Sequence, residues 1–254
     1  MNACGEKPTD KKMKWVATAH GTVRHLILFD LDGTLAPLSK PIPKEALRSM
    51  LALQDQGHEI GIASGKPLYY LTGLCRQAGL RNVWLIGENG AALQKDVALP
   101  PRERLRLPLS ETTVLACEQI KADATAKFAN RIWFQPNEVA VTIFFDTEAT
   151  QEEVRIWLEA KQTWLERHQL IVFPHNDSFD ISPAHIDKGK AIRVLLDYLD
   201  IRQESSIAVG DTWNDLPMFD VCAKSIAIDF PEATMAEYHV TDLSAAFDCI
   251  ETLL

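Results

Sequence analysis

Two aspartates separated by one residue are the clearest candidates for chemistry in this sequence. Asp30 and Asp32 lie in the segment Asp-Leu-Asp-Gly-Thr, directly after the apolar run of residues 24–29. A carboxylate at the end of a buried strand is costly unless a metal ion or hydrogen-bond donors pair with it. The first can attack phosphorus to form an aspartyl phosphate, and the second can protonate the leaving oxygen and later deprotonate water. The pair therefore predicts phosphoryl chemistry, with Asp30 as nucleophile and Asp32 as acid and base.

A second acidic segment, Gly-Asp-Thr-Trp-Asn-Asp, contains Asp211 and Asp215 and follows the apolar run 206–209. Carboxylate oxygens are the ligands that Mg²⁺, a hard cation, prefers. Four aspartates that met in one crevice would repel one another. A divalent cation would offset this repulsion, and also that between Asp30 and an incoming phosphate. We therefore expect a Mg²⁺ site that both acidic segments share.

Two further segments carry groups that bind phosphate. Ser64 and Gly65 follow the apolar run 58–63, where a hydroxyl and backbone N–H groups at a helix start can hold a phosphate oxygen. Lys188 opens a helical stretch and would place positive charge on a phosphoryl group in transfer. Taken alone, Ser64 is also explained as a helix cap and Lys188 as a solvated side chain. Their interpretation as phosphate ligands depends on all four segments meeting at one site.

The elements that must position these segments alternate between strand and helix. Strands buried on both faces are indicated by the apolar runs 24–29, 58–63, 83–86, 206–209 and 225–228. Helical spacing marks residues 43–56, 67–78, 188–199, 214–222 and 244–253. This order predicts an α/β fold with a doubly wound parallel sheet. Ligands bind beyond the carboxyl ends of the strands in such sheets, where the four segments lie.

The pattern changes near residue 92, which predicts a smaller α+β cap domain inserted at residues 92–182. The catalytic core is then residues 23–91 and 183–254, and residues 1–22 form a loose N-terminal extension. A cap that closes over the core excludes water and selects the substrate. Within the insertion, helices are expected at 111–129 and 150–168 and strands at 139–145, 169–174 and 178–182. Candidate cap contacts are Arg102, Arg104, Arg106 and the loop 175–178.

Composition narrows the choice of partners and compartment. The 254 residues are 46% apolar, and acidic residues outnumber basic ones by 35 to 26, for a net charge of −9. This balance argues against nucleic acid as a partner, which would need a broad basic face. The sequence has no run of ~18 apolar residues that would predict a membrane span. Five cysteines without CxxC spacing favour a reducing compartment, so we expect a cytoplasmic monomer or homodimer.

The four segments, in this order, resemble the motifs of the haloacid dehalogenase superfamily. The insertion follows the segment Glu88-Asn-Gly-Ala, between the second motif, at Ser64, and the third, at Lys188. This arrangement is similar to the type IIB branch, which includes Cof-like sugar-phosphate phosphatases, sucrose- and trehalose-phosphate phosphatases and mannosyl-3-phosphoglycerate phosphatase. The resemblance covers residues 24–254, although the cap is short for the larger Cof-like members.

The resemblance implies a Mg²⁺-dependent phosphatase that acts on a sugar phosphate or another small phosphorylated metabolite. Asp30 would be the nucleophile and a metal ligand. Asp32 would be the acid and base and would give a backbone carbonyl to the metal. Asp211 would also bind Mg²⁺, and Asp215 would bind it or support its ligands.

The resemblance also implies the phosphate contacts. Ser64, followed by Gly65, and Lys188 would bind phosphate, and Asn214 would contact phosphate or substrate. Ser64 stands where threonine is frequent, which retains the hydroxyl. Two other classes share parts of the pattern: a metal-dependent glycosyltransferase, whose DxD segment also follows a strand, and a receiver-like module phosphorylated on aspartate. The first leaves Ser64, Lys188 and Asp211 unexplained, and the second needs neither Asp32 nor a cap.

Overall fold

The computed structural model describes residues 23–232 and 235–254, so the expectation for residues 1–22 lies outside the described residues. Its larger sheet has eight strands in the order β12-β11-β10-β1-β2-β3-β4-β5. Six of them run parallel: β1 (Leu26–Asp30), β2 (Glu59–Ala63), β3 (Val83–Gly87), β10 (Ser206–Gly210), β11 (Lys224–Ile228) and β12 (Tyr238–Val240). Strand β1 lies between β2 and β10, at the centre of the parallel part.

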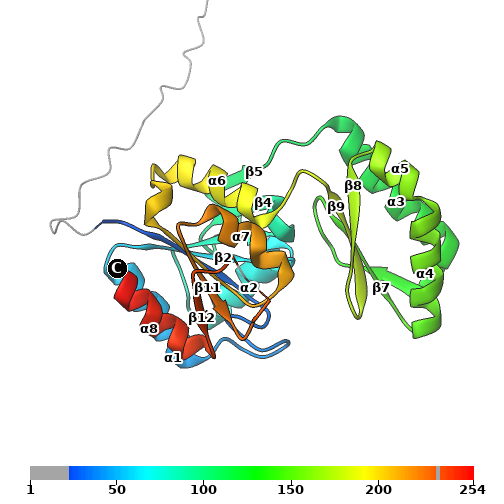
Figure 1. The fold of residues 1–254 in the computed structure, drawn as a ribbon. Coiled ribbons are helices and arrows are strands. Elements are labelled where there is room, and N and C mark those ends of the chain that lie inside the picture. The colour runs from blue at the N-terminus through cyan, green and yellow to red at the C-terminus, as the bar shows by residue number, and fades with distance from the viewer. Residues whose placement is uncertain (1–22, 233–234) are drawn as a thin grey trace, which may run out of the picture.

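Helices cover both faces of this sheet (Figure 1). Helices α1 (Lys44–Asp55), α2 (Leu68–Ala78) and α8 (Leu243–Leu253) share one apolar cluster with Ile27 and Phe29 of β1. Helices α6 (Lys188–Leu199) and α7 (Leu216–Val221) share another with Leu26 and Leu28. Successive side chains of a strand point to opposite faces, so an apolar strand supplies both clusters. The expected doubly wound α/β core is confirmed.

The sequence pattern did not predict three strands of the larger sheet, namely β12 at one edge and two strands at the other. Strands β4 (Ala92–Lys95) and β5 (Glu103–Arg106) continue it as an antiparallel hairpin beside β3. The change of pattern at residue 92 therefore does not mark the start of a separate unit, and that boundary is corrected. The chain turns at the 3-10 helix η1 (Glu88–Gly90) and pairs back on β3. Strand β5 is an edge strand with charged, exposed positions, so it lacks the apolar run by which buried strands are predicted.

The smaller sheet has four antiparallel strands in the order β6-β7-β9-β8. They are β6 (Ile132–Phe134), β7 (Val141–Phe145), β8 (Leu170–Pro174) and β9 (Ser178–Pro183). Helices α3 (Glu111–Phe128), α4 (Glu148–Ala160) and α5 (Gln162–Arg167) form an apolar cluster with one face of this sheet. In Figure 1 these helices lie on the side away from the larger sheet, so the other face of the smaller sheet is turned toward it.

Two expected helices are divided in the structure. The stretch 150–168 forms α4 and α5, which are separated at Lys161. The stretch 214–222 begins as the 3-10 helix η4 (Trp213–Asp215) before α7. Short 3-10 turns also occur at η2 (Ala129–Arg131) and η3 (Gln203–Ser205). Within the described ranges, no helix combines the length and apolarity needed to cross a membrane.

Candidate active site

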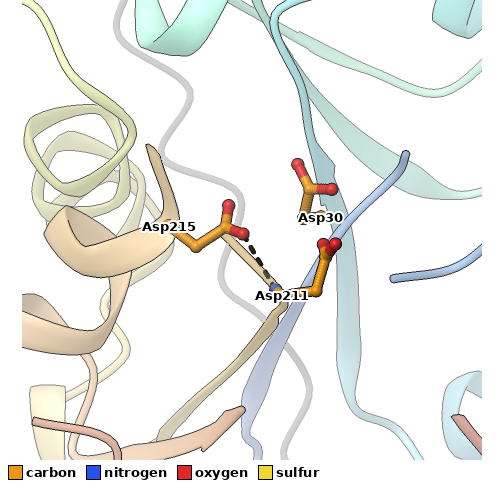
Figure 2. A group of neighbouring side chains, drawn as sticks. All are labelled: Asp30, Asp211 and Asp215. Atoms are coloured by element: carbon orange, nitrogen blue, oxygen red, sulfur yellow. Dashed lines mark hydrogen bonds between the residues drawn. The ribbon is translucent and has the colours of Figure 1, made fainter. Parts of the chain in front are cut away.

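Three of the predicted aspartates meet at the carboxyl ends of neighbouring strands. Asp30 ends β1 and Asp211 directly follows β10, which pairs with β1 in parallel. Asp215 lies one turn further on, in η4. Figure 2 shows the three side chains around one point. One carboxylate oxygen from each lies within 4.8 Å of the others, so the three could bind a single metal ion.

Backbone N–H groups hold Asp215 in place. Its Oδ2 atom accepts hydrogen bonds from the backbone N atoms of Asp211 and Thr212, both at 3.0 Å, and Figure 2 shows the first of these. Thr212 and Asp215 also form a capping box, in which each side chain bonds to the backbone of the other. The side chain is fully buried, and its other oxygen, Oδ1, accepts a hydrogen bond from Lys188 Nζ.

Lys188 connects the two acidic segments. Its Nζ atom donates to Asp30 Oδ1 at 2.6 Å and to Asp215 Oδ1 at 2.7 Å. The lysine is the first residue of α6 and is 1% exposed. Burial by itself lowers its pKa, but the two carboxylates outweigh burial and raise the pKa above its ordinary value. Lys188 is therefore a buried ammonium group at the centre of the site.

The site carries more negative than positive charge. Burial, together with the neighbouring carboxylates of Asp215 and Asp211, raises the pKa of Asp30 to about 7, against the lowering effect of Lys188. Burial also raises the pKa of Asp211, although Thr34 donates a hydrogen bond to its Oδ1 at 2.6 Å. Three carboxylates around one ammonium group leave an excess that a cation would neutralise. The donors are all oxygen atoms, so they fit a hard divalent ion such as Mg²⁺.

Asp32 lies beside this cluster, and its carboxylate is not part of it. The side chain is half-buried and its Oδ2 atom lies 3.7 Å from Lys66 Nζ. The loop closes on itself, because Gly33 N donates to Ala36 O at 2.8 Å. Gly33 has a φ of +95°, and a Cβ atom there would lie 2.0 Å from Asp211 Oδ2. Only glycine lets the first segment approach Asp211 this closely.

Ser64 and Gly65 follow β2, the strand beside β1. Ser64 is 2% exposed, and its Oγ accepts a hydrogen bond from Lys66 N at 3.1 Å. The register pairs Asp30 with Ala63, which places Ser64 at the same end of the sheet as Asp30. The Gly65 carbonyl accepts a hydrogen bond from Gln135 Nε2 of the smaller sheet's connection at 3.1 Å. The binding of phosphate by these two residues stays a prediction.

Asn214 lies in η4 between Asp211 and Asp215, and its side chain is exposed. Its Oδ1 atom accepts a hydrogen bond from Thr212 Oγ1 at 2.6 Å. The structure thus places Asn214 on the loop that holds the site. A contact with phosphate or substrate stays a prediction.

Glu88 is a site neighbour whose role the sequence did not reveal. It is 2% exposed and accepts hydrogen bonds from the backbone N atoms of Glu138, Val139 and Ala140 at 2.7, 2.9 and 3.0 Å. Burial raises its pKa, against these three hydrogen bonds. The partners lie about fifty positions further along the chain, so no local pattern indicates them. Glu88 fastens the β6–β7 connection to the larger sheet.

The arginines expected to contact a substrate have a different partner. Arg104 and Arg106 form ion pairs with Glu138, the latter at 2.6 Å. They reinforce the attachment made by Glu88, on the same turn between β6 and β7. Both side chains thus have a partner within the protein, and a contact with substrate stays a prediction. Two guanidinium groups around one carboxylate also lower the pKa of Glu138, in spite of its partial burial.

A doubly wound sheet with acidic loops at the ends of its central strands, and a second sheet inserted in the chain between β5 and β10, matches the arrangement predicted for a hydrolase with a cap. The family model for haloacid dehalogenase-like hydrolases matches residues 27–99 and 116–239. The chain belongs to this family. The resemblance drawn from the four motifs, including the type IIB branch, is confirmed, and a phosphatase is the class of enzyme that this membership supports.

Similar proteins agree with this assignment. A phosphoglycolate phosphatase of Methanospirillum hungatei is 25% identical over 193 residues, which cover 76% of this chain and 78% of that protein. A haloacid dehalogenase-like hydrolase of Bacteroides thetaiotaomicron has the same fold, with a TM-score of 0.72 and 18% identity over 89% of this chain and 99% of that one. The sucrose-phosphatase of Synechocystis, solved with sucrose and phosphate, has a TM-score of 0.65 and 17% identity, and covers 91% of this chain and 98% of its own.

Proposed function

We propose that the chain is a Mg²⁺-dependent phosphomonoester hydrolase that works through an aspartyl phosphate on Asp30. The observation that carries the proposal is the position of Asp30 at the end of β1. There it is 2.6 Å from the ammonium group of Lys188 and within 4.8 Å of two further carboxylates. This arrangement supplies a nucleophile, positive charge for a phosphoryl group and an oxygen-rich metal site. The glycosyltransferase alternative leaves Lys188 unexplained, and the receiver-like alternative needs neither Asp32 nor a cap.

The first half of the reaction forms the covalent intermediate. An Asp30 oxygen bonds to phosphorus while the bond from phosphorus to the ester oxygen breaks. Asp32 gives its proton to the leaving oxygen, which departs as an alcohol. Lys188, Ser64 and the Gly65 backbone hold the phosphoryl oxygens. Mg²⁺ held by the three clustered carboxylates would neutralise the negative charge that gathers at the phosphoryl group.

The second half restores the enzyme. A water molecule attacks phosphorus, and Asp32 takes the proton that the water loses. The bond between phosphorus and the Asp30 oxygen breaks, so inorganic phosphate leaves and the Asp30 carboxylate is free again. Asp32 is protonated once more and is ready for the next ester. One carboxylic acid thus serves both halves, which explains a position beside the metal cluster and not within it.

The smaller sheet with its three helices is the proposed cap, and its open face would cover the leaving group. We take the cap to be the segment between β5 and α6, which contains all four strands of the smaller sheet and starts later than the boundary expected at residue 92. The proposed substrates are small phosphorylated metabolites, in line with relatives named as phosphatases of phosphoglycolate and of sucrose phosphate. The state of assembly is proposed to be a monomer or homodimer.

The proposal is tested with p-nitrophenyl phosphate, a general phosphomonoester. We expect hydrolysis that stops in EDTA and returns with Mg²⁺. Asp30→Asn should abolish turnover, because the amide cannot act as the nucleophile. Asp32→Asn should slow breakdown of the intermediate, so that mass spectrometry of acid-quenched protein detects an added phosphoryl group. Turnover by Asp30→Asn at the wild-type rate would overturn the proposal.

A further inference from the structure

Two aromatic rings lie side by side on the face of the smaller sheet that is opposite its helices. The register pairs Trp133 of β6 with Phe144 of β7. Their ring centroids are 5.5 Å apart and their planes differ by 11°, so the rings are stacked. The strand neighbours Ile132, Ile143 and Phe145 pack in the apolar cluster with the helices. Because successive side chains of a strand point to opposite faces, the stacked pair lies on the other face.

This aromatic pair leaves a large ring surface in contact with solvent. Trp133 is 54% exposed, and Phe144 is half-buried. Stacking across an edge strand stabilises a sheet, but a buried ring would serve that purpose equally well. Aromatic rings favour offset-stacked neighbours with centroids ~4.5–7 Å apart. The exposed part of the indole can therefore accept a further flat ring.

A hydrogen bond to the core places the aromatic pair beside the candidate active site. Gln135 follows β6, and its backbone N atom donates to Thr142 O at 3.1 Å, so the pairing of the strands continues to this residue. Trp133 and Gln135 are two positions apart, hence on the same face and roughly 7 Å from each other along the strand. Gln135 Nε2 donates to the carbonyl oxygen of Gly65 at 3.1 Å. Gly65 belongs to the segment proposed to hold the phosphoryl group.

The polar side chains next to the aromatic pair are bonded to one another. Gln135 Nε2 also donates to Asn137 Oδ1 at 2.7 Å, and Asn137 Nδ2 donates to Thr142 Oγ1 at 3.0 Å. The Thr142 hydroxyl in turn donates to Asp180 Oδ1 at 2.6 Å. A leaving group rich in hydroxyls would have to break these bonds or give up water without replacement, which costs free energy. A flat apolar ring needs no such partner and gains from stacking.

We infer that Trp133, stacked on Phe144, binds a planar aromatic ring of the leaving group, so that the preferred substrates are phosphomonoesters that carry such a ring. This inference rests on the proposed function and names a class of substrate for it. The spacing from Gln135 sets the reach, because the ring must be joined to the ester oxygen by a short link. Carbocyclic and heteroaromatic rings share the flat π face that the indole would contact.

The test compares benzyl phosphate with cyclohexylmethyl phosphate on the full chain with Mg²⁺. Both esters carry a six-membered carbon ring one methylene away from the ester oxygen, but only the benzyl ring is flat and aromatic. We expect wild type to prefer benzyl phosphate in kcat/KM. Trp133→Leu keeps an apolar side chain and removes the ring. It should lower this preference about 2- to 10-fold, the range of an aromatic stacking contact, mainly because the KM for benzyl phosphate rises.

Two further variants separate ring binding from a structural role. Trp133→Phe keeps a ring and should retain most of the preference. Trp157→Leu is the matched control and should leave the preference unchanged, because Trp157 lies on α4 and packs edge-on against Phe128 on the helix side, with centroids 5.5 Å apart. Equal kcat/KM for the two esters in wild type, or an unchanged preference in Trp133→Leu, overturns the inference, while hydrolysis of both esters upholds the phosphatase. Hydrolysis of neither ester also overturns the inference, and the proposed function falls with it only if p-nitrophenyl phosphate is left intact as well.

Discussion

Replacing Lys188 with methionine removes the one ammonium group that separates the carboxylates of Asp30 and Asp215. Methionine fills a similar volume, so the main change is electrostatic. The lysine side chain and that of Asp215 are fully buried, and that of Asp30 is 6% exposed. Removing one partner of a buried ion pair costs about 3–5 kcal/mol, because the remaining charge is left without compensation. Here one cation serves two carboxylates at 2.6 and 2.7 Å.

Protonation limits this cost. The pKa of Asp30 is already about 7 with Lys188 present, and it rises further without the ammonium group. Near neutral pH the folded variant therefore takes up a proton on Asp30 and avoids the full repulsion. We expect a loss of about 3 kcal/mol at pH 7 without metal, or roughly 6–12 °C in Tm for a chain of this size. The loss of stability grows as pH rises, because keeping Asp30 protonated in the folded variant becomes more costly at higher pH.

The assay is urea unfolding followed by circular dichroism in EDTA, at pH 5 and pH 8. Lys190→Met is the matched control, since Lys190 lies two positions along the same helix and forms only an exposed pair with Asp187 at 3.2 Å. Such a pair contributes about 0–1 kcal/mol. Mg²⁺ should recover part of the loss in Lys188→Met by neutralising the carboxylates. A loss below about 1 kcal/mol at pH 8, or equal losses at both pH values, would refute the reasoning.

Three further outcomes follow from particular contacts. Glu88→Gln should weaken the attachment of residues 138–140 by about 1–3 kcal/mol, because one carboxylate oxygen is replaced by an NH₂ group that faces a backbone N–H. Hydrogen exchange of the backbone amides should then become faster in this turn and nowhere else. Gly189→Ala adds about 1 kcal/mol of helix propensity, yet its Cβ would lie 2.2 Å from the Pro217 carbonyl oxygen, so we expect net destabilisation in urea; a more stable variant would contradict this packing. In EDTA, stability should fall as pH rises from 3.8 to about 7, because Asp30 holds its proton more tightly in the folded chain. Thermal melts should show that Asp30→Asn flattens this slope and that Mg²⁺ opposes it.

The elements of the core were predictable because their signals are local. A strand buried on both faces is apolar throughout, and β1, β3 and β10 are buried at every position. The strands that escaped prediction are short or lie at edges. Strand β6 has three residues with Trp133 exposed, and β5 alternates between half-exposed and exposed positions. Their pairing depends on neighbours elsewhere in the chain, which no local periodicity contains.

The helix at 150–168 shows a similar limit. Its apolar spacing continues across Lys161, where the chain leaves helical geometry and α5 begins. The amine of Lys161 lies over the rings of both Trp157 and Trp164, at 5.3 and 5.6 Å, and donates to Asp123 at 2.8 Å. The break is thus stabilised by a partner on α3. A helical pattern alone does not contain this information.

The sequence by itself determined which groups are available and at which strand ends they lie. Asp30, Ser64 and Asp211 each follow an apolar run, and parallel strands place such positions at one edge. Only the tertiary structure decided which groups touch. Lys188 bonds to Asp30 across 158 positions of sequence, and Glu88 binds a turn about fifty positions away. The physical reason is that hydrogen bonds and ion pairs act over a few ångströms in space, whereas local sequence patterns specify only which face of an element a side chain occupies.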